Sequence, residues 1–244
     1  MKIAVIADSH GNLLALQAVL RDIGRLRPDL VVNLGDLVSG PFDPAGSADA
    51  QMALGAATLA GNHERQVLAG ATGASDAFAR PRLADRHLAW LHTLPPTLSL
   101  LDGDLFACHG SPAGGDLDYL LEDVSAGHAA LAPDETIRGK LAGIGHARVV
   151  LCGHTHIARI VTAGDVLVVN PGSVGMPSFR DDRPCPHVMD AGSPHARYAT
   201  LTRAPQGWAA TLHAVPYDHQ AAARQAERNG RPEVAFAVRT GRSP

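Results

Sequence analysis

Residues 2–10 read Lys-Ile-Ala-Val-Ile-Ala-Asp-Ser-His, a short apolar run that ends abruptly in an aspartate and a histidine. An unbroken apolar run of this length is typical of a strand that is buried on both faces of a sheet. Asn12 can then cap a helix, because apolar residues recur at helical spacing as far as Leu26. A second apolar run over residues 30–34 ends in Gly35-Asp36. This order predicts a βαβ unit and therefore an α/β fold.

The same pattern recurs further along the chain. Strands predicted at 57–60, 105–108 and 149–152 also end in polar side chains. In open α/β sheets, functional groups gather just beyond the carboxyl ends of the strands. We therefore expect one site built from five strand ends, with these residues: Asp8, His10, Asp36, Asn62, His63, His109, His154 and His156.

The remainder of the chain predicts more sheet and a final helix. Turn signals at 102–104 and 163–165 lie between apolar runs and indicate hairpins. Further strands are expected at 198–201 and 209–215, followed by a helix at 218–228. Since neither an internal repeat nor a linker divides the sequence, we predict a single domain over residues 1–244.

Bulk properties exclude several classes of protein. The formal net charge is −3 and no basic block is present, which argues against a nucleic-acid partner held by its phosphates. The first apolar run is cut short by Asp8, so it does not read as a signal peptide, and no stretch is long enough to span a membrane. The three cysteines lack zinc-ribbon spacing and fit free thiols in a reducing cytoplasm, where we expect the protein.

The donor set indicates the type of metal site. Seven of the clustered side chains offer oxygen or imidazole nitrogen, which is too many ligands for one tetrahedral zinc ion. Mixed ligation of this kind suits divalent manganese, iron, zinc, nickel or cobalt. Seven ligands with one shared carboxylate fit two ions about 3.5–4 Å apart, as in two-metal hydrolases. We expect a hydroxide bridging two such ions to attack phosphorus.

The order of the motifs resembles that of a known family. Asp-x-His, Gly-Asp, Gly-Asn-His-Glu, His-Gly and Gly-His-x-His occur in this sequence over residues 8–156. This order is similar to that of the calcineurin-like metallophosphoesterase superfamily. Residues 35–41 and 170–175 resemble its small bacterial and archaeal phosphodiesterase branch, which is related to diadenosine tetraphosphatases. The resemblance implies a four-layer αββα sandwich of two mixed β-sheets flanked by helices, with the metals at one edge.

The resemblance also implies a role for each residue. One metal would be held by Asp8, His10, Asp36 and His156, and the second by Asp36, Asn62, His109 and His154. Asp36 would bridge two divalent transition-metal ions, with manganese favoured. His63 would assist the leaving group, and a positioned general acid contributes about 10²–10⁴-fold. The implied enzyme is a metal-dependent phosphoesterase with His63, Asp36 and Asn62 in catalysis, acting on a phosphodiester, a phosphomonoester or a nucleotide phosphoanhydride.

Two other functions stay open at this point, a nuclease of the same superfamily and a non-catalytic metal-binding scaffold. The complete ligand set together with His63 favours an enzyme. Residues 176–197 depart from the family pattern and predict a longer or restructured loop that could shape the substrate pocket. Exposed sheet edges in such sandwiches can pair, which also leaves a homo-oligomer open.

Overall fold

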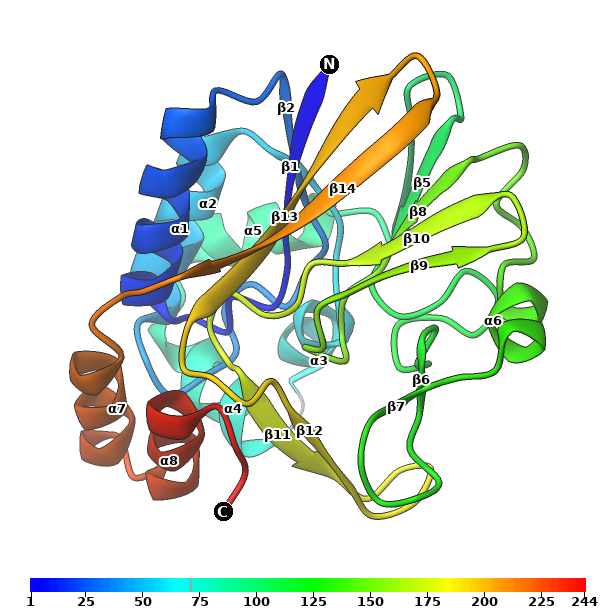
Figure 1. The fold of residues 1–244 in the computed structure, drawn as a ribbon. Coiled ribbons are helices and arrows are strands. Elements are labelled where there is room, and N and C mark those ends of the chain that lie inside the picture. The colour runs from blue at the N-terminus through cyan, green and yellow to red at the C-terminus, as the bar shows by residue number, and fades with distance from the viewer. Residues whose placement is uncertain (71) are drawn as a thin grey trace.

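Two five-stranded sheets form the centre of the protein (Figure 1). The computed structural model describes residues 1–70 and 72–244. The first sheet has the order β14 (Gly207–Val215), β13 (Ala196–Ala204), β1 (Lys2–Ile6), β2 (Leu30–Asn33) and β3 (Ala57–Thr58). The second has the order β4 (Thr97–Leu100), β5 (Leu105–Cys108), β8 (Val149–Leu151), β10 (Val166–Asn170) and β9 (Arg159–Ala163).

Both sheets are mixed, because parallel strands at the centre are joined by antiparallel neighbours. In the first sheet β1, β2 and β3 run parallel, while β13 is antiparallel to both β1 and β14. In the second sheet β5, β8 and β10 run parallel between the antiparallel strands β4 and β9. The carboxyl ends of the parallel strands therefore point to one edge of the sandwich, as the sequence predicted.

Helices cover the outer faces of the sheets and one end of the molecule (Figure 1). They are α1 (Leu13–Leu26), α2 (Pro44–Leu54), α3 (Asn62–Ala69), α4 (Ala74–Ala79), the 3-10 turn η1 (Arg80–Arg82), α5 (Asp85–Thr93), α6 (Asp134–Lys140), α7 (His219–Arg228) and α8 (Pro232–Thr240). Two short ribbons complete the fold, β6 (Glu122–Asp123) with β7 (Ala130–Leu131), and β11 (Ser178–Asp181) with β12 (His187–Asp190). No described helix is both long enough and apolar enough to cross a membrane.

The alternation of side chains along the strands produces the layers. Ile3 and Val5 point from β1 into the core between the sheets, where they join residues of the second sheet such as Leu151. Ala4 and Ile6 point the other way and pack against α1. On the far side of the second sheet, Val150 and Val168 pack against α6 in the same manner. The expected four-layer αββα sandwich is confirmed.

Two details differ from expectation. The strand expected at 57–60 is only two residues long, because the amide of Ala60 donates to Pro95 O rather than to a strand neighbour. The segment 176–197, expected as a longer or restructured loop, contains the β11–β12 hairpin and the first residues of β13. Helix α8 lies after the last element that the sequence pattern defined and packs on α7 through Val234 and Val238.

Candidate metal centre

The five predicted strand ends meet at one edge of the sandwich. The turn after β1 carries Asp8 and His10, the turn after β2 carries Asp36, and α3 begins with Asn62 and His63. The second sheet contributes His109 after β5, and His154 and His156 after β8. All seven predicted metal ligands are buried, and His63 is partly exposed. The structure thus brings together every side chain that the sequence placed in the site.

The turns that carry the ligands have an unusual backbone. Asp8, His10, Asp36, His154 and His156 all have positive φ, between 46° and 67°. This left-handed region is uncommon outside glycine, although Asp, Asn and His enter it more readily than other residues. Backbone hydrogen bonds between the first two turns hold this conformation, with Asp8 N donating to Gly35 O at 2.9 Å and His10 N donating to Asp36 O at 2.9 Å.

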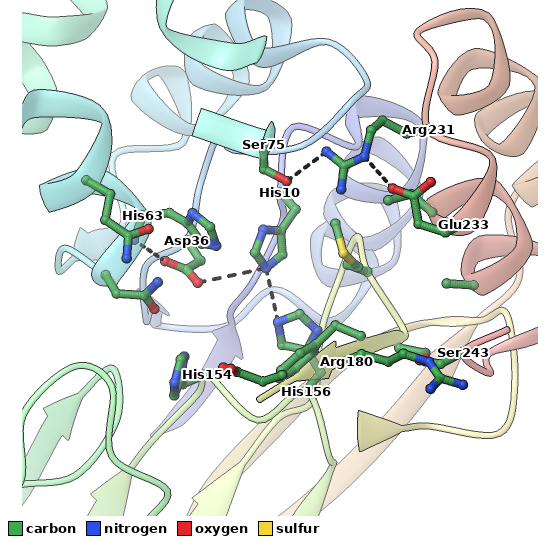
Figure 2. A pocket seen from close by; sticks show the side chains of 18 of the residues that line it. His10, Asp36, His63, Ser75, His154, His156, Arg180, Arg231, Glu233 and Ser243 are labelled. Carbon is green, nitrogen blue, oxygen red and sulfur yellow. Dashed lines mark hydrogen bonds and ion pairs between the residues drawn. The ribbon is translucent and has the colours of Figure 1, made fainter. Parts of the chain in front are cut away.

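One group of donors consists of Asp8, His10 and His156, whose ligand atoms lie within 4.8 Å of one another. Figure 2 shows His10 and His156 side by side. His10 Nδ1 donates to Ser39 O at 2.8 Å, so Nε2 of the neutral ring carries a lone pair. That lone pair faces His156 Nε2 at 3.0 Å. His156 Nε2 in turn lies 3.5 Å from Asp8 Oδ1. Electron-rich atoms therefore converge on a common point.

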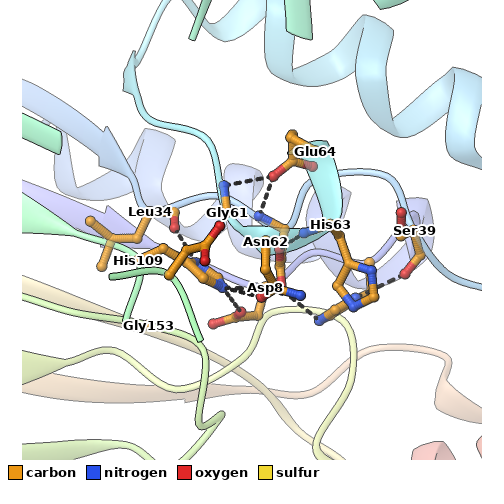
Figure 3. Close-up of polar contacts among 12 residues, drawn as sticks. Asp8, Leu34, Ser39, Gly61, Asn62, His63, Glu64, His109 and Gly153 are labelled. Carbon is orange, nitrogen blue, oxygen red and sulfur yellow. Dashed lines mark hydrogen bonds and ion pairs between the residues drawn. The ribbon is translucent and has the colours of Figure 1, made fainter. Parts of the chain in front are cut away.

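A second group consists of Asp36, His109 and His154. Figure 3 shows His109 between Leu34 and Asn62. His109 Nδ1 donates to Leu34 O at 2.7 Å. Its Nε2 faces Asp36 Oδ2 at 3.2 Å and Asn62 Oδ1 at 3.1 Å. Asp36 Oδ2 also lies 3.8 Å from His10 Nε2, so this carboxylate stands between the two groups and is placed to bridge them.

The protonation of the rings reflects the buried carboxylates. Burial, followed by the neighbouring His156, lowers the pKa of His10 to about 4, and burial followed by His109 lowers the pKa of His154 to about 4. Both rings are therefore neutral, which is the form that binds metal. Burial also opposes charge on His109, but Asp36 and Asp8 override it and raise its pKa to about 10. The two carboxylates thus require positive charge beside them, which a proton or a metal ion can supply.

The donor set fits divalent cations. Both carboxylate oxygens of Asp8 and Nδ1 of His156 are buried and have no hydrogen-bond partner among the described residues. A buried charge without a partner is costly, and a coordinated cation removes that cost. The arrangement therefore matches oxygen and imidazole ligation of divalent metal ions.

His63 differs from the other histidines of the site because its ring contacts a carboxylate, Asp76, that belongs to neither donor group. Its Nδ1 lies 2.7 Å from Asp76 Oδ1, and its backbone amide donates to Asp36 Oδ1 at 3.0 Å. Burial would lower the pKa of His63, but Asp36 and then Asp76 outweigh it and raise that pKa to about 9. His63 also lies close enough to His10 and Asp36 to complete a third possible donor group.

Two further residues support the site without having been predicted. The fully buried Glu64 accepts the amides of Asp36 at 2.8 Å, Leu37 at 2.8 Å and Gly61 at 2.9 Å (Figure 3). Its position in the Gly-Asn-His-Glu motif was a usable signal. Asp76 lies 13 residues after His63 on α4 and belongs to no motif, so only the fold reveals their pairing.

A cavity of about 430 Å³ opens over the site (Figure 2). Four of the site histidines, His10, His63, His154 and His156, form its floor. The hairpin β11–β12 contributes Phe179 and Arg180, while α8 and the residue before it contribute Val234 and Arg231. The first residues of the segment 176–197 therefore line this cavity.

Comparison with known proteins agrees with this geometry. The profile of the calcineurin-like phosphoesterase superfamily domain matches residues 1–191. The chain belongs to this superfamily. An uncharacterized protein of Methanocaldococcus jannaschii is 26% identical over 193 residues, which cover 72% of this chain and 76% of the relative.

Two solved structures share the architecture of this chain. A metallophosphoesterase from Sphaerobacter thermophilus is 25% identical, with a TM-score of 0.73 over 99% of this chain and 100% of its own. A hypothetical protein from Pyrococcus horikoshii has a TM-score of 0.76 at 18% identity, over 100% of this chain and 99% of its own, which shows a common fold. The family expected from the motifs is confirmed.

Proposed function

We propose that this calcineurin-like phosphoesterase is a metal-dependent hydrolase of a small phosphate ester or nucleotide. One observation carries the proposal: buried carboxylate oxygens and imidazole nitrogens converge beneath an open cavity that His63 also lines. In a purely structural cluster, these polar groups would form hydrogen bonds to one another or to the rest of the protein. Here they are arranged to hold cations next to a space that a substrate can enter.

The proposed ligands divide into two sets that share Asp36. Asp8, His10, Asp36 and His156 would hold one ion, and Asp36, Asn62, His109 and His154 the other. We propose two divalent transition-metal ions, with manganese favoured for mixed oxygen and nitrogen ligation. When bound, such ions polarise phosphoryl oxygens and lower the pKa of water.

The chain's own catalytic group in this proposal is His63. Its Nδ1 is occupied by Asp76, which leaves Nε2 as the nitrogen that can give a proton to the departing oxygen. The Asp76 contact also fixes the ring, since the two atoms are 2.7 Å apart. Asn62 and Asp36 hold the start of α3 against the ligand cluster, so the position of His63 depends on the metal-binding residues.

The cysteines have no part in the proposed chemistry. Cys108 and Cys152 are buried, and burial raises the pKa of each thiol, which makes both unreactive. Three free thiols are consistent with a reducing cytoplasm, the location that we propose.

The test is hydrolysis of bis-p-nitrophenyl phosphate by protein loaded with Mn²⁺, compared with the same protein treated with a chelator. We expect turnover that the chelator abolishes and that re-added Mn²⁺ restores. The matched variant is Asp36→Asn, which keeps the shape of the side chain but removes the charge shared by both proposed ligand sets. Metal binding measured by mass spectrometry, without turnover of any phosphate ester in a broad panel, would contradict the proposal and favour a scaffold.

A further inference from the structure

A second cavity of about 730 Å³ adjoins the first. Leu117, His154 and Asp181 belong to the walls of both cavities, so the two open into each other beside a proposed metal ligand. His63 lines the first cavity but not the second. The volume of the second cavity lies within the range of about 300–1,000 Å³ that is common for small-molecule sites.

Tyr119 forms a fixed aromatic wall of the second cavity. Its ring centroid lies 5.3 Å from that of His154 and 5.4 Å from that of His187. His187 Nδ1 donates to Cys185 O at 2.7 Å, so its Nε2 is the acceptor in the neutral ring. The Tyr119 hydroxyl lies 3.1 Å from His187 Nε2 and 3.5 Å from Asp181 Oδ2. The β11–β12 hairpin thus holds the tyrosine in place beside the site.

The charged side chains around the second cavity are mostly acidic. Four carboxylates face two cations, namely Asp118, Glu122, Asp123 and Asp181 against Lys140 and Arg183. Lys140 binds Asp118 at 2.7 Å, and Glu122 binds Arg159 at 3.0 Å. Asp123 and Asp181 against Arg183 therefore set the charge that a ligand group meets. A ligand group that carries negative charge is therefore disfavoured in the second cavity.

We propose that the second cavity binds the ester group that remains on phosphorus after hydrolysis, and that it selects a bulky group that is neutral or cationic. This inference rests on the proposed function. In the reaction, the oxygen of water forms a bond to phosphorus and the bond from phosphorus to the leaving oxygen breaks. His63 supplies the proton to that oxygen, so the leaving group lies in the first cavity. The retained ester bond stays intact, and the group that it carries occupies the second.

A series of p-nitrophenyl phosphodiesters tests the charge preference, because the leaving group is constant and only the retained group varies. Choline and neohexyl groups have nearly the same shape but differ in charge, and a carboxypropyl group is anionic. We expect kcat/KM to be highest for the choline ester, lower for the neohexyl ester and at least about tenfold lower again for the carboxypropyl ester. Equal values for the three esters would overturn the charge preference.

A variant that fills the cavity tests the location. Thr136 lies on the exposed side of α6 and lines the second cavity, so Thr136→Trp would occupy it without disturbing the core. We expect a rise in KM of at least about tenfold for the neohexyl ester and little change for methyl p-nitrophenyl phosphate, whose retained group is small. Glu135→Trp is the matched control, because Glu135 is exposed on the same helix and does not line the cavity. Equal effects of the two variants would overturn the location.

Cys185 gives a readout that does not depend on turnover. It lines the second cavity and is partly exposed, whereas Cys108 and Cys152 are buried. Neohexyl methylphosphonate, which is not hydrolysed, should slow alkylation of Cys185 in Mn²⁺-loaded protein by at least about fivefold, while methylphosphonate alone should not. Turnover without this protection would overturn the second cavity as a subsite and leave the phosphoesterase function standing. Protection without turnover of any ester would support the subsite and refute the proposed function.

Discussion

A methyl group added at Gly175 tests how tightly the ligand turns are packed. Gly175 follows β10, and its amide donates to Asp8 O at 3.0 Å. A Cβ atom at this position would lie 1.9 Å from Ser9 O and 2.7 Å from Ser9 C. Ser9 lies between the proposed ligands Asp8 and His10. Because the obstacle is backbone, Gly175→Ala requires the turn after β1 to move by about 1 Å.

The expected magnitude follows from what this movement breaks. Overpacking of a dense region costs about 1–3 kcal/mol. The movement also disturbs two hydrogen bonds to Asp8 O, one from the Gly175 amide and one from Ser173 Oγ at 2.7 Å. Each of these contributes about 1 kcal/mol. We expect the free energy of unfolding of metal-free protein to fall by about 3 kcal/mol. A shift of about 1 Å in two ligands should also lower turnover roughly 10²-fold.

Urea unfolding of chelator-treated protein measures the first effect, and calorimetric titration with Mn²⁺ together with turnover measures the second. Gly24→Ala is the control, because a Cβ atom at Gly24 in α1 meets nothing within 4 Å. That change should raise stability by roughly 0.5–1 kcal/mol, since alanine is the better helix former. The reasoning fails if Gly175→Ala unfolds within about 0.5 kcal/mol of wild type and binds Mn²⁺ equally well.

Three further predictions concern charged or titratable groups. Asp36→Asn should lose both metal ions in elemental analysis, and full occupancy would contradict a bridging role. His63→Ala should keep its metals but lose about 10²–10⁴-fold in kcat for esters with poor leaving groups, and an unchanged kcat would refute the general acid. Asp104 accepts hydrogen bonds from Arg148 at 2.7 Å and Trp208 at 3.0 Å, and despite partial burial these lower its pKa. A lowered folded-state pKa contributes stability above the unfolded-state value, so Asp104→Asn should cost about 1 kcal/mol at pH 7. That cost should vanish in urea titrations below the folded-state pKa, and a cost independent of pH would contradict this explanation.

The sequence predicted the core and the ligand cluster because both follow from local patterns. Alternation places Ile3 between the sheets and Ile6 against α1, and parallel strands bring Asp8 and Asp36 to the same edge. No local pattern marks residues that are far apart along the chain and touch only through tertiary packing. Asp76 was missed for this reason.

The wall of the second cavity was missed for the same reason. Tyr119 lies in a stretch without clear periodicity, and its partner His187 belongs to a hairpin that the sequence pattern did not define. The pattern did indicate that residues 176–197 depart from the family. It gave neither the two strands nor the hydrogen bond that holds Tyr119, because both depend on how the hairpin packs against the β6–β7 side of the molecule.

The left-handed turns limit which types of residue can serve as ligands in the proposed metal centre. Five of the seven predicted ligand positions require positive φ, a conformation that costs an ordinary L-residue about 1–2 kcal/mol. Asp, Asn and His enter it more cheaply and are also the donors suited to metals of intermediate hardness. Exchanges among these three residues can therefore retune the metal preference while the backbone stays the same. A β-branched residue would add backbone strain at each turn. A cysteine would enter the left-handed region less readily than Asp, Asn or His. The backbone conformation of the turns thus restricts which side chains can be present at these positions, independently of metal binding.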